Sequence, residues 1–168
     1  MKSDATRGRI EVPPELAARF ARGEITLAEF VGLDRPTLYA IAGLGFRLLT
    51  SGNLRGARDI YRGLVAADPF DSVFRCHLAA THHRLGEYDE ALEEYTNALR
   101  FNVANVDALA GRGELYAQQG RLPEAVADLS AAVKLDPQGD RSSTVRAGAI
   151  LKAVREASSR ADNRRADV

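Results

Sequence analysis

The only cysteine of the chain and all three of its histidines fall within eight positions, at Cys76, His77, His82 and His83. Thiolates and imidazoles are ligands for zinc, and a cysteine beside a histidine can act as a nucleophile. Zinc ligands on one helix usually stand three or four residues apart, whereas no two of these four residues do. Cys76 and His83 share one side of a helix but lie about 10 Å apart along its axis. The spacing therefore predicts neither a metal site nor a catalytic pair.

The rest of the sequence offers little other chemistry. The serines have no nucleophile-elbow context, and no glycine-rich phosphate loop follows a strand. The acidic run from Glu87 to Glu94 has the spacing of a solvated helix face. Basic and acidic residues both number 23, and the basic residues near the C-terminus are interleaved with acids and lack aromatic neighbours. We expect no enzymatic activity, no cofactor and no nucleic-acid partner.

Cysteine content and hydropathy bear on the cellular compartment. A single cysteine cannot form an internal disulfide, so nothing indicates an oxidising environment. The first residues lack the apolar core of a signal peptide, and the longest uncharged run falls far short of the ~20 residues that span a bilayer. With 45% hydrophobic and 27% charged residues, the composition is that of a soluble globular protein. These observations predict a cytoplasmic protein without membrane insertion.

A repeat of 34 residues organises the middle of the chain, bringing Gly52, Gly86 and Gly120 into register. The same offset aligns further small residues, large apolar residues and prolines: Ala57, Ala91 and Ala125; Gly45, Ala79 and Gly113; Tyr61, Tyr95 and Leu129; Leu64, Ala98 and Ala132; Pro69, Val103 and Pro137. A unit of this length with small residues at fixed positions is the tetratricopeptide pattern, in which each unit is a helix, a turn and a helix.

Each aligned position has a physical reason. Glycine after the first helix allows a left-handed C-cap at little cost, and Gly or Ala lets two helices cross closely. Proline cannot continue a helix, so it marks the end of the second helix. The pattern predicts one all-α domain of 168 residues, a tetratricopeptide-repeat solenoid with repeats at residues 38–71, 72–105 and 106–139.

The flanks are also expected to be helical. Residues 13–37 are predicted to form an N-terminal helical extension, with Pro14 in a first turn and Thr26 and Glu29 in a capping box. Residues 140–160 are predicted to form a capping helix on the third repeat. The apolar stripe expected on this helix consists of Val145, Ala149, Ile150 and Val154. Residues 1–12 are expected to be a disordered leader and residues 161–168 a tail.

The first helices of stacked tetratricopeptide repeats line a concave groove. The family places its groove residues at the second, fifth, ninth, twelfth and thirteenth positions of each unit. Carried onto this sequence, the predicted peptide-binding residues are Tyr39, Ala42, Phe46 and Leu49 in the first repeat, Val73, Cys76, Ala80, His83 and Arg84 in the second, and Asp107, Ala110, Glu114 and Ala117 in the third, with Thr50 and Gln118 at the remaining thirteenth positions. In this register His82 takes a packing position, and His77, at the sixth position, is expected to point elsewhere.

The residue types predict the kind of groove. One tetratricopeptide class clamps a C-terminal carboxylate with basic and amide side chains at the fifth and ninth positions, and this sequence has no such cationic clamp. The groove is predicted to be apolar at one end and more acidic at the other, which suits an extended apolar peptide. Each buried aliphatic anchor would contribute on the order of 1.5–3 kcal/mol before ordering costs. Alternatively, Tyr39, Phe46 and Leu49 pack against the protein's own N-terminal helix.

The segments "LAADPFDSVF", "LGEYDEALEEYTNAL" and "GRGELYAQQGRLPEA", with the leader "RFARGEITLAEFVGLDRPTLYAI", resemble the class II chaperones of bacterial type III secretion. The resemblance spans roughly Pro14 to Val154. It implies a cytoplasmic chaperone without enzymatic activity, whose groove holds an extended segment near the N-terminus of a hydrophobic translocator protein and keeps that client soluble and competent for export.

The resemblance also implies dimerisation, because the family often dimerises through its N-terminal helices. The candidate dimer contacts are Phe20, Leu27, Phe30, Val31 and Leu33. The sequence departs from the family near the groove, at "FRLL" (Phe46 to Leu49) and at the cysteine and histidines of the second repeat. The alternative is a general tetratricopeptide adaptor or scaffold protein in another bacterial complex.

Overall fold

The computed structural model describes residues 12–166, with side-chain surroundings as far as residue 157. This part of the chain is all-helical and contains no strand, which confirms the predicted fold class. The helices are α1 (Pro14–Ala21), α2 (Leu27–Phe30), α3 (Arg35–Thr50), α4 (Leu54–Ala67), α5 (Ser72–Leu85), α6 (Tyr88–Phe101), α7 (Val106–Gln118), α8 (Leu122–Leu135) and α9 (Ser142–Ala166). The expected disordered leader lies, but for residue 12, outside the described residues.

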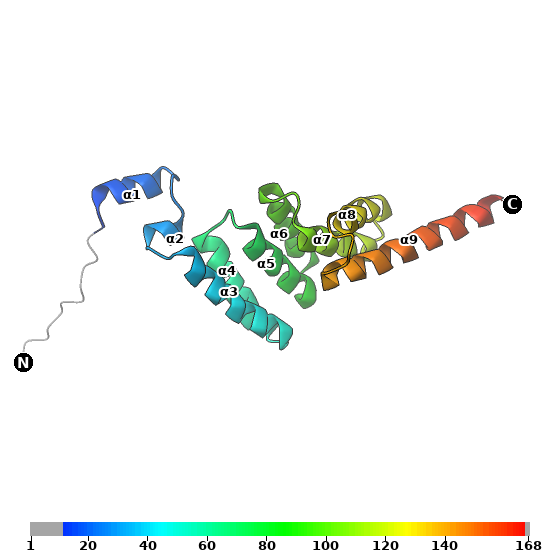
Figure 1. The fold of residues 1–168 in the computed structure, drawn as a ribbon, viewed down its shortest axis with the longest axis horizontal. Coiled ribbons are helices and arrows are strands. Elements are labelled where there is room, and N and C mark those ends of the chain that lie inside the picture. The colour runs from blue at the N-terminus through cyan, green and yellow to red at the C-terminus, as the bar shows by residue number, and fades with distance from the viewer. Residues whose placement is uncertain (1–11, 167–168) are drawn as a thin grey trace, which may run out of the picture.

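Helices α3 to α8 form three antiparallel pairs that stack one on the next (Figure 1). Small residues allow the close crossing within a pair, as the repeat pattern predicts. A methyl group added at Gly45 would come within 3.0 Å of Tyr61, and one added at Gly113 within 2.8 Å of Leu129. Because a packed interior has little free space, these positions admit almost nothing larger than glycine.

The turns within and between the pairs follow the chemistry of glycine and proline. Gly52, Gly86 and Gly120 have φ of 86°, 79° and 73°, the left-handed region that glycine enters without steric cost. Helices α4 and α8 end two residues before Pro69 and Pro137, as expected.

Side-chain caps fix where several helices begin. Asp34, Asn53, Asp71 and Asn105 each accept a backbone N–H from the first turn of the helix that follows. Helix α3 therefore starts at Arg35, three residues before the first repeat as defined by the glycine register.

The N-terminal extension contains two short helices, and the predicted capping box is present at the second. The Thr26 backbone N–H donates to Glu29 at 2.7 Å, and the Glu29 N–H donates to the Thr26 hydroxyl at 3.2 Å. Among the described helices α1 contacts α2 alone, through stacked rings of Phe20 and Phe30 whose centroids lie 4.7 Å apart. The N-terminal helix consequently does not cover the groove-facing side of α3.

Helix α9 packs against α7 and α8 as a cap and then projects beyond them (Figure 1). The predicted apolar stripe was wrong in part, because Ala147, Leu151 and Val154 are buried whereas Val145 is 62% exposed. The buried residues Ala147, Leu151 and Val154 are four and three positions apart, so they also lie along one side of a helix. Contact with the third repeat determines that this side, and not the predicted one, is buried. The helix also continues past residue 160 into the segment expected to be a tail. No helix of the described part is both long and apolar enough to cross a membrane.

Candidate peptide-binding groove

A cavity of about 630 Å³ opens between the first helices of the three pairs and the start of α9. Its lining comprises Phe46, Leu49, Cys76, His77, Ala80, His83, Arg84, Tyr88, Tyr95, Asp107, Gly111, Glu114, Gln118, Ser142, Ser143 and Arg146. Four helices therefore supply most of one surface, which has the size of a site for a short peptide segment or small ligand.

Eight of the thirteen predicted contact residues line this cavity: Phe46, Leu49, Cys76, Ala80, His83, Arg84, Asp107 and Glu114. The other five, Tyr39, Ala42, Val73, Ala110 and Ala117, are not part of the lining. Ala42 and Ala110 are buried in helix contacts instead. The predicted groove positions thus converge on the cavity mainly through the C-terminal halves of α3 and α5.

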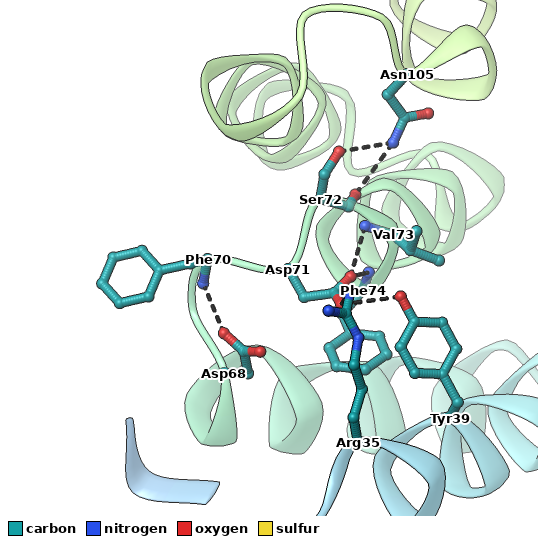
Figure 2. Close-up of polar contacts among 9 residues, drawn as sticks. All are labelled: Arg35, Tyr39, Asp68, Phe70, Asp71, Ser72, Val73, Phe74 and Asn105. Atoms are coloured by element: carbon teal, nitrogen blue, oxygen red, sulfur yellow. Dashed lines mark hydrogen bonds and ion pairs between the residues drawn. The ribbon is translucent and has the colours of Figure 1, made fainter. Parts of the chain in front are cut away.

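Tyr39 points at a polar joint between the first two repeats (Figure 2). Its hydroxyl donates to one carboxylate oxygen of Asp71 at 2.9 Å, and the other oxygen accepts the backbone N–H groups of Val73 and Phe74 at 2.8 and 3.2 Å. Arg35 approaches the same carboxylate at 3.5 Å. Asp71 therefore ties α3 to the N-terminus of α5 and sets the position of that helix in the groove.

The next joint repeats the arrangement with an amide. The Asn105 side chain donates to the Ser72 backbone carbonyl and hydroxyl at 3.3 and 2.7 Å (Figure 2). It also accepts the Ala108 N–H at 3.0 Å. The Asn105 side chain therefore caps α7 and also holds the start of α5. These joints fix the spacing of the helices that line the cavity.

The apolar end of the cavity is built around Phe46, which is 50% exposed. Its ring and that of His77 meet in an edge-to-face arrangement with a centroid distance of 5.8 Å, and His77 stacks on Tyr61 at 5.1 Å. The expectation that His77 points away from the groove was wrong, because His77 lines the cavity and its ring packs on Tyr61 of the first repeat. Burial lowers the pKa of His77, so the ring is neutral at pH 7.

The other members of the cysteine and histidine cluster are separated by the packing. Burial raises the pKa of the Cys76 thiol, which stays protonated. His83 is hydrogen-bonded to Gln118 across the groove at 3.0 Å, and His82 to Glu87 at 2.5 Å in a half-buried position. Within the described residues, no three His, Cys, Asp or Glu side chains could hold a metal ion.

The negative charge at the acidic end of the cavity is offset by basic residues at the start of α9 and just before it. Asp107 accepts hydrogen bonds from Arg141 at 2.6 Å and Ser143 at 2.5 Å, and Arg146 lies 3.7 Å from Glu114. At the opposite side the Arg84 guanidinium donates to the Leu49 backbone carbonyl. The charged groups of the lining are thus largely paired within the protein, and the groove presents less free negative charge than the sequence predicts.

Residues from two further sources were missed by the repeat analysis. Ser142, Ser143 and Arg146 come from α9, which packs against the third pair, α7 and α8. Extending the 34-residue register leads from Asp107 to Arg141, which is bonded to Asp107 but is not part of the lining, so the register does not give these three residues. Tyr95 comes from a second helix, and no groove position of the repeat pattern includes it.

A family model described as tetratricopeptide repeat matches residues 43–102 and again residues 78–140, more than half of the chain. The chain belongs to the tetratricopeptide repeat family. Low calcium response locus protein H of Yersinia pestis is 26% identical to it over 138 residues, covering 81% of this chain and 82% of that protein.

Solved tetratricopeptide structures resemble the chain along most of their length. The type III secretion translocator chaperone SycD of Yersinia enterocolitica matches with a TM-score of 0.69 at 26% identity, covering 77% of this chain and 98% of SycD. PcrH in complex with the chaperone binding region of PopD matches with a TM-score of 0.67 at 27% identity, covering 76% and 97%. These findings confirm the resemblance to type III secretion translocator chaperones.

Proposed function

We propose that this protein is a cytoplasmic chaperone of type III secretion that carries out no catalysis. Its groove holds an extended apolar segment of a hydrophobic translocator protein, and the bound client stays soluble until export. The resemblance to SycD and to PcrH, which binds a region of PopD, supports this class of partner.

The proposal rests on the exposed apolar surface around Phe46, whose charged neighbours in the groove are already paired within the protein. Phe46 is half exposed in this cavity, whereas an apolar side chain at such a site would be expected to be covered in a protein that binds no ligand. Asp107 and Glu114 have basic neighbours, and Arg84 is bonded to a backbone carbonyl. A charged client residue would have to displace one of these partners, so a neutral segment is favoured.

The experiment measures binding of a labelled peptide, the chaperone-binding region of PopD, by fluorescence anisotropy. Phe46→Glu is compared with Leu44→Glu, which places the same charge on the same helix at a similarly exposed residue outside the cavity. We expect Phe46→Glu to weaken binding at least tenfold, because one apolar anchor is worth about 1.5–3 kcal/mol, and Leu44→Glu to have no effect. Equal losses in both variants, or no binding by the unmodified protein, would favour the general adaptor instead.

We further propose that the N-terminal extension is the surface for a second copy. Its apolar side chains remain exposed in the single chain: Phe20, Leu27, Val31 and Leu33, with Phe30 stacked on Phe20. One solved structure of SycD shows an alternative dimer of that protein. Sedimentation velocity of Val31→Glu tests the surface, since a dimer built on it would become a monomer while the groove is unchanged.

A further inference from the structure

Two tyrosines occupy equivalent places in successive repeats but end in different surroundings. Tyr61 and Tyr95 are 34 residues apart, on α4 and α6. The Tyr61 hydroxyl donates to the Ala42 backbone carbonyl at 3.1 Å, and His77 covers the ring. Tyr61 is therefore a satisfied core residue, and it does not line the cavity.

Tyr95 meets a different neighbour. The residue equivalent to His77 one repeat later is Gly111, where a side chain is absent. A methyl group at Gly111 would overlap both the ring and the hydroxyl of Tyr95. The end of the Tyr95 side chain thus fills the space that the His77 side chain takes in the preceding repeat, and both Tyr95 and Gly111 line the cavity.

The Tyr95 hydroxyl is directed at this cavity and is accessible from it, because it is not among the fully enclosed side-chain atoms that lack a partner in the described residues. The residue is only 4% exposed, and no group among the described residues forms a hydrogen bond with its hydroxyl. Burial raises the pKa of Tyr95, so the phenol keeps its proton and remains a donor. A hydroxyl donor that is accessible at the floor of a groove and bonded to no described protein group is free to bind a ligand, which makes it a candidate ligand contact.

We propose that the Tyr95 hydroxyl donates a hydrogen bond to a main-chain carbonyl of the client segment in the groove. The inference rests on the proposed function. An extended segment carries main-chain carbonyls that no helix or sheet satisfies, whatever its side chains are. Tyr95 then fixes the depth and register of the segment, while the apolar end around Phe46 selects its side chains.

The test removes the hydroxyl from Tyr95 in one variant and from Tyr61 in another, by replacing the tyrosine with phenylalanine. With the chaperone-binding region of PopD as the probe, we expect Tyr95→Phe to bind about 3- to 10-fold more weakly, which is the size of one net hydrogen bond. Tyr61→Phe is the matched control and should bind with unchanged affinity. In thermal melts without peptide the order of the two variants is reversed. Tyr61→Phe is less stable than the unmodified protein, whereas Tyr95→Phe is equally stable because the Tyr95 hydroxyl has no hydrogen-bond partner among the described residues.

A second arm identifies the acceptor. Probe peptides in which a single amide is replaced by an ester have a weaker carbonyl acceptor at one known position. One ester should weaken binding to the unmodified protein and leave binding to Tyr95→Phe unchanged. The inference is overturned if Tyr95→Phe binds like the unmodified protein, or if it melts at a lower temperature to the same extent as Tyr61→Phe. Failure of the unmodified protein to bind any probe would instead overturn the proposed function, and this inference with it.

Discussion

Replacing Asp71 by alanine is expected to lower the free energy of unfolding by about 2 kcal/mol. The carboxylate is 8% exposed and accepts the backbone N–H groups of Val73 and Phe74, so alanine removes the cap of α5, which is worth about 1 kcal/mol. The Tyr39 hydroxyl also loses its acceptor, at a cost of about 1 kcal/mol. The Arg35 ion pair adds little, because the Arg35 side chain is largely exposed.

Urea unfolding followed by circular dichroism measures this loss, and Asp71→Asn is the matched control. Asparagine is as good a helix cap as aspartate and keeps an oxygen in the same place, so it should cost less than 1 kcal/mol. A cost below 1 kcal/mol for alanine would refute the claim that this joint holds the first two repeats together. Equal costs for the two variants would show that the charge, rather than the cap, carries the effect.

Three further predictions concern the cavity wall. Gly111→Ala should destabilise the protein by about 1–3 kcal/mol, because its methyl group overlaps Tyr95, whereas Gly63→Ala on an open helix face should stabilise it by up to about 1 kcal/mol in the same urea titration. The free energy of unfolding should fall as the pH drops below about 6.5, because the buried ring of His77 binds a proton less readily than in the unfolded chain; this component should be missing in His77→Leu. Cys76, buried and held as a thiol, should react with a disulfide reagent far more slowly than the unfolded protein does, and bound probe peptide should slow it again; an equal rate in native and unfolded protein would contradict its place in the groove floor.

The helical repeats could be predicted from the sequence because their signals are local. Gly52, Gly86 and Gly120 mark the turns where only a left-handed backbone fits, and Pro69 and Pro137 follow the ends of second helices. Such features depend on the conformational limits of single residues, which do not change with the surroundings.

The contents of the groove were less predictable, because they depend on how one repeat meets the next. The His77 ring stacks on Tyr61 of the preceding repeat, and this contact cannot be read from the position of His77 within its own repeat. Tyr95 reaches the cavity only because Gly111, sixteen residues later, leaves room for its hydroxyl. The stripe on α9 was misjudged for a similar reason, since contact with the third repeat selects Leu151 over Val145. Long-range packing decides between patterns that are equally regular in the sequence.

The central claim is that a translocator segment lies in the groove against Phe46, and site-specific photocrosslinking tests it most directly. A photoreactive phenylalanine is placed at position 46 in one variant and, as control, at position 44 in another, both on α3 and similarly exposed. Each variant is irradiated with the chaperone-binding region of PopD. The account predicts a crosslinked product from position 46 and none from position 44. A crosslink from position 44 alone, or from neither position while the peptide remains bound, would contradict it.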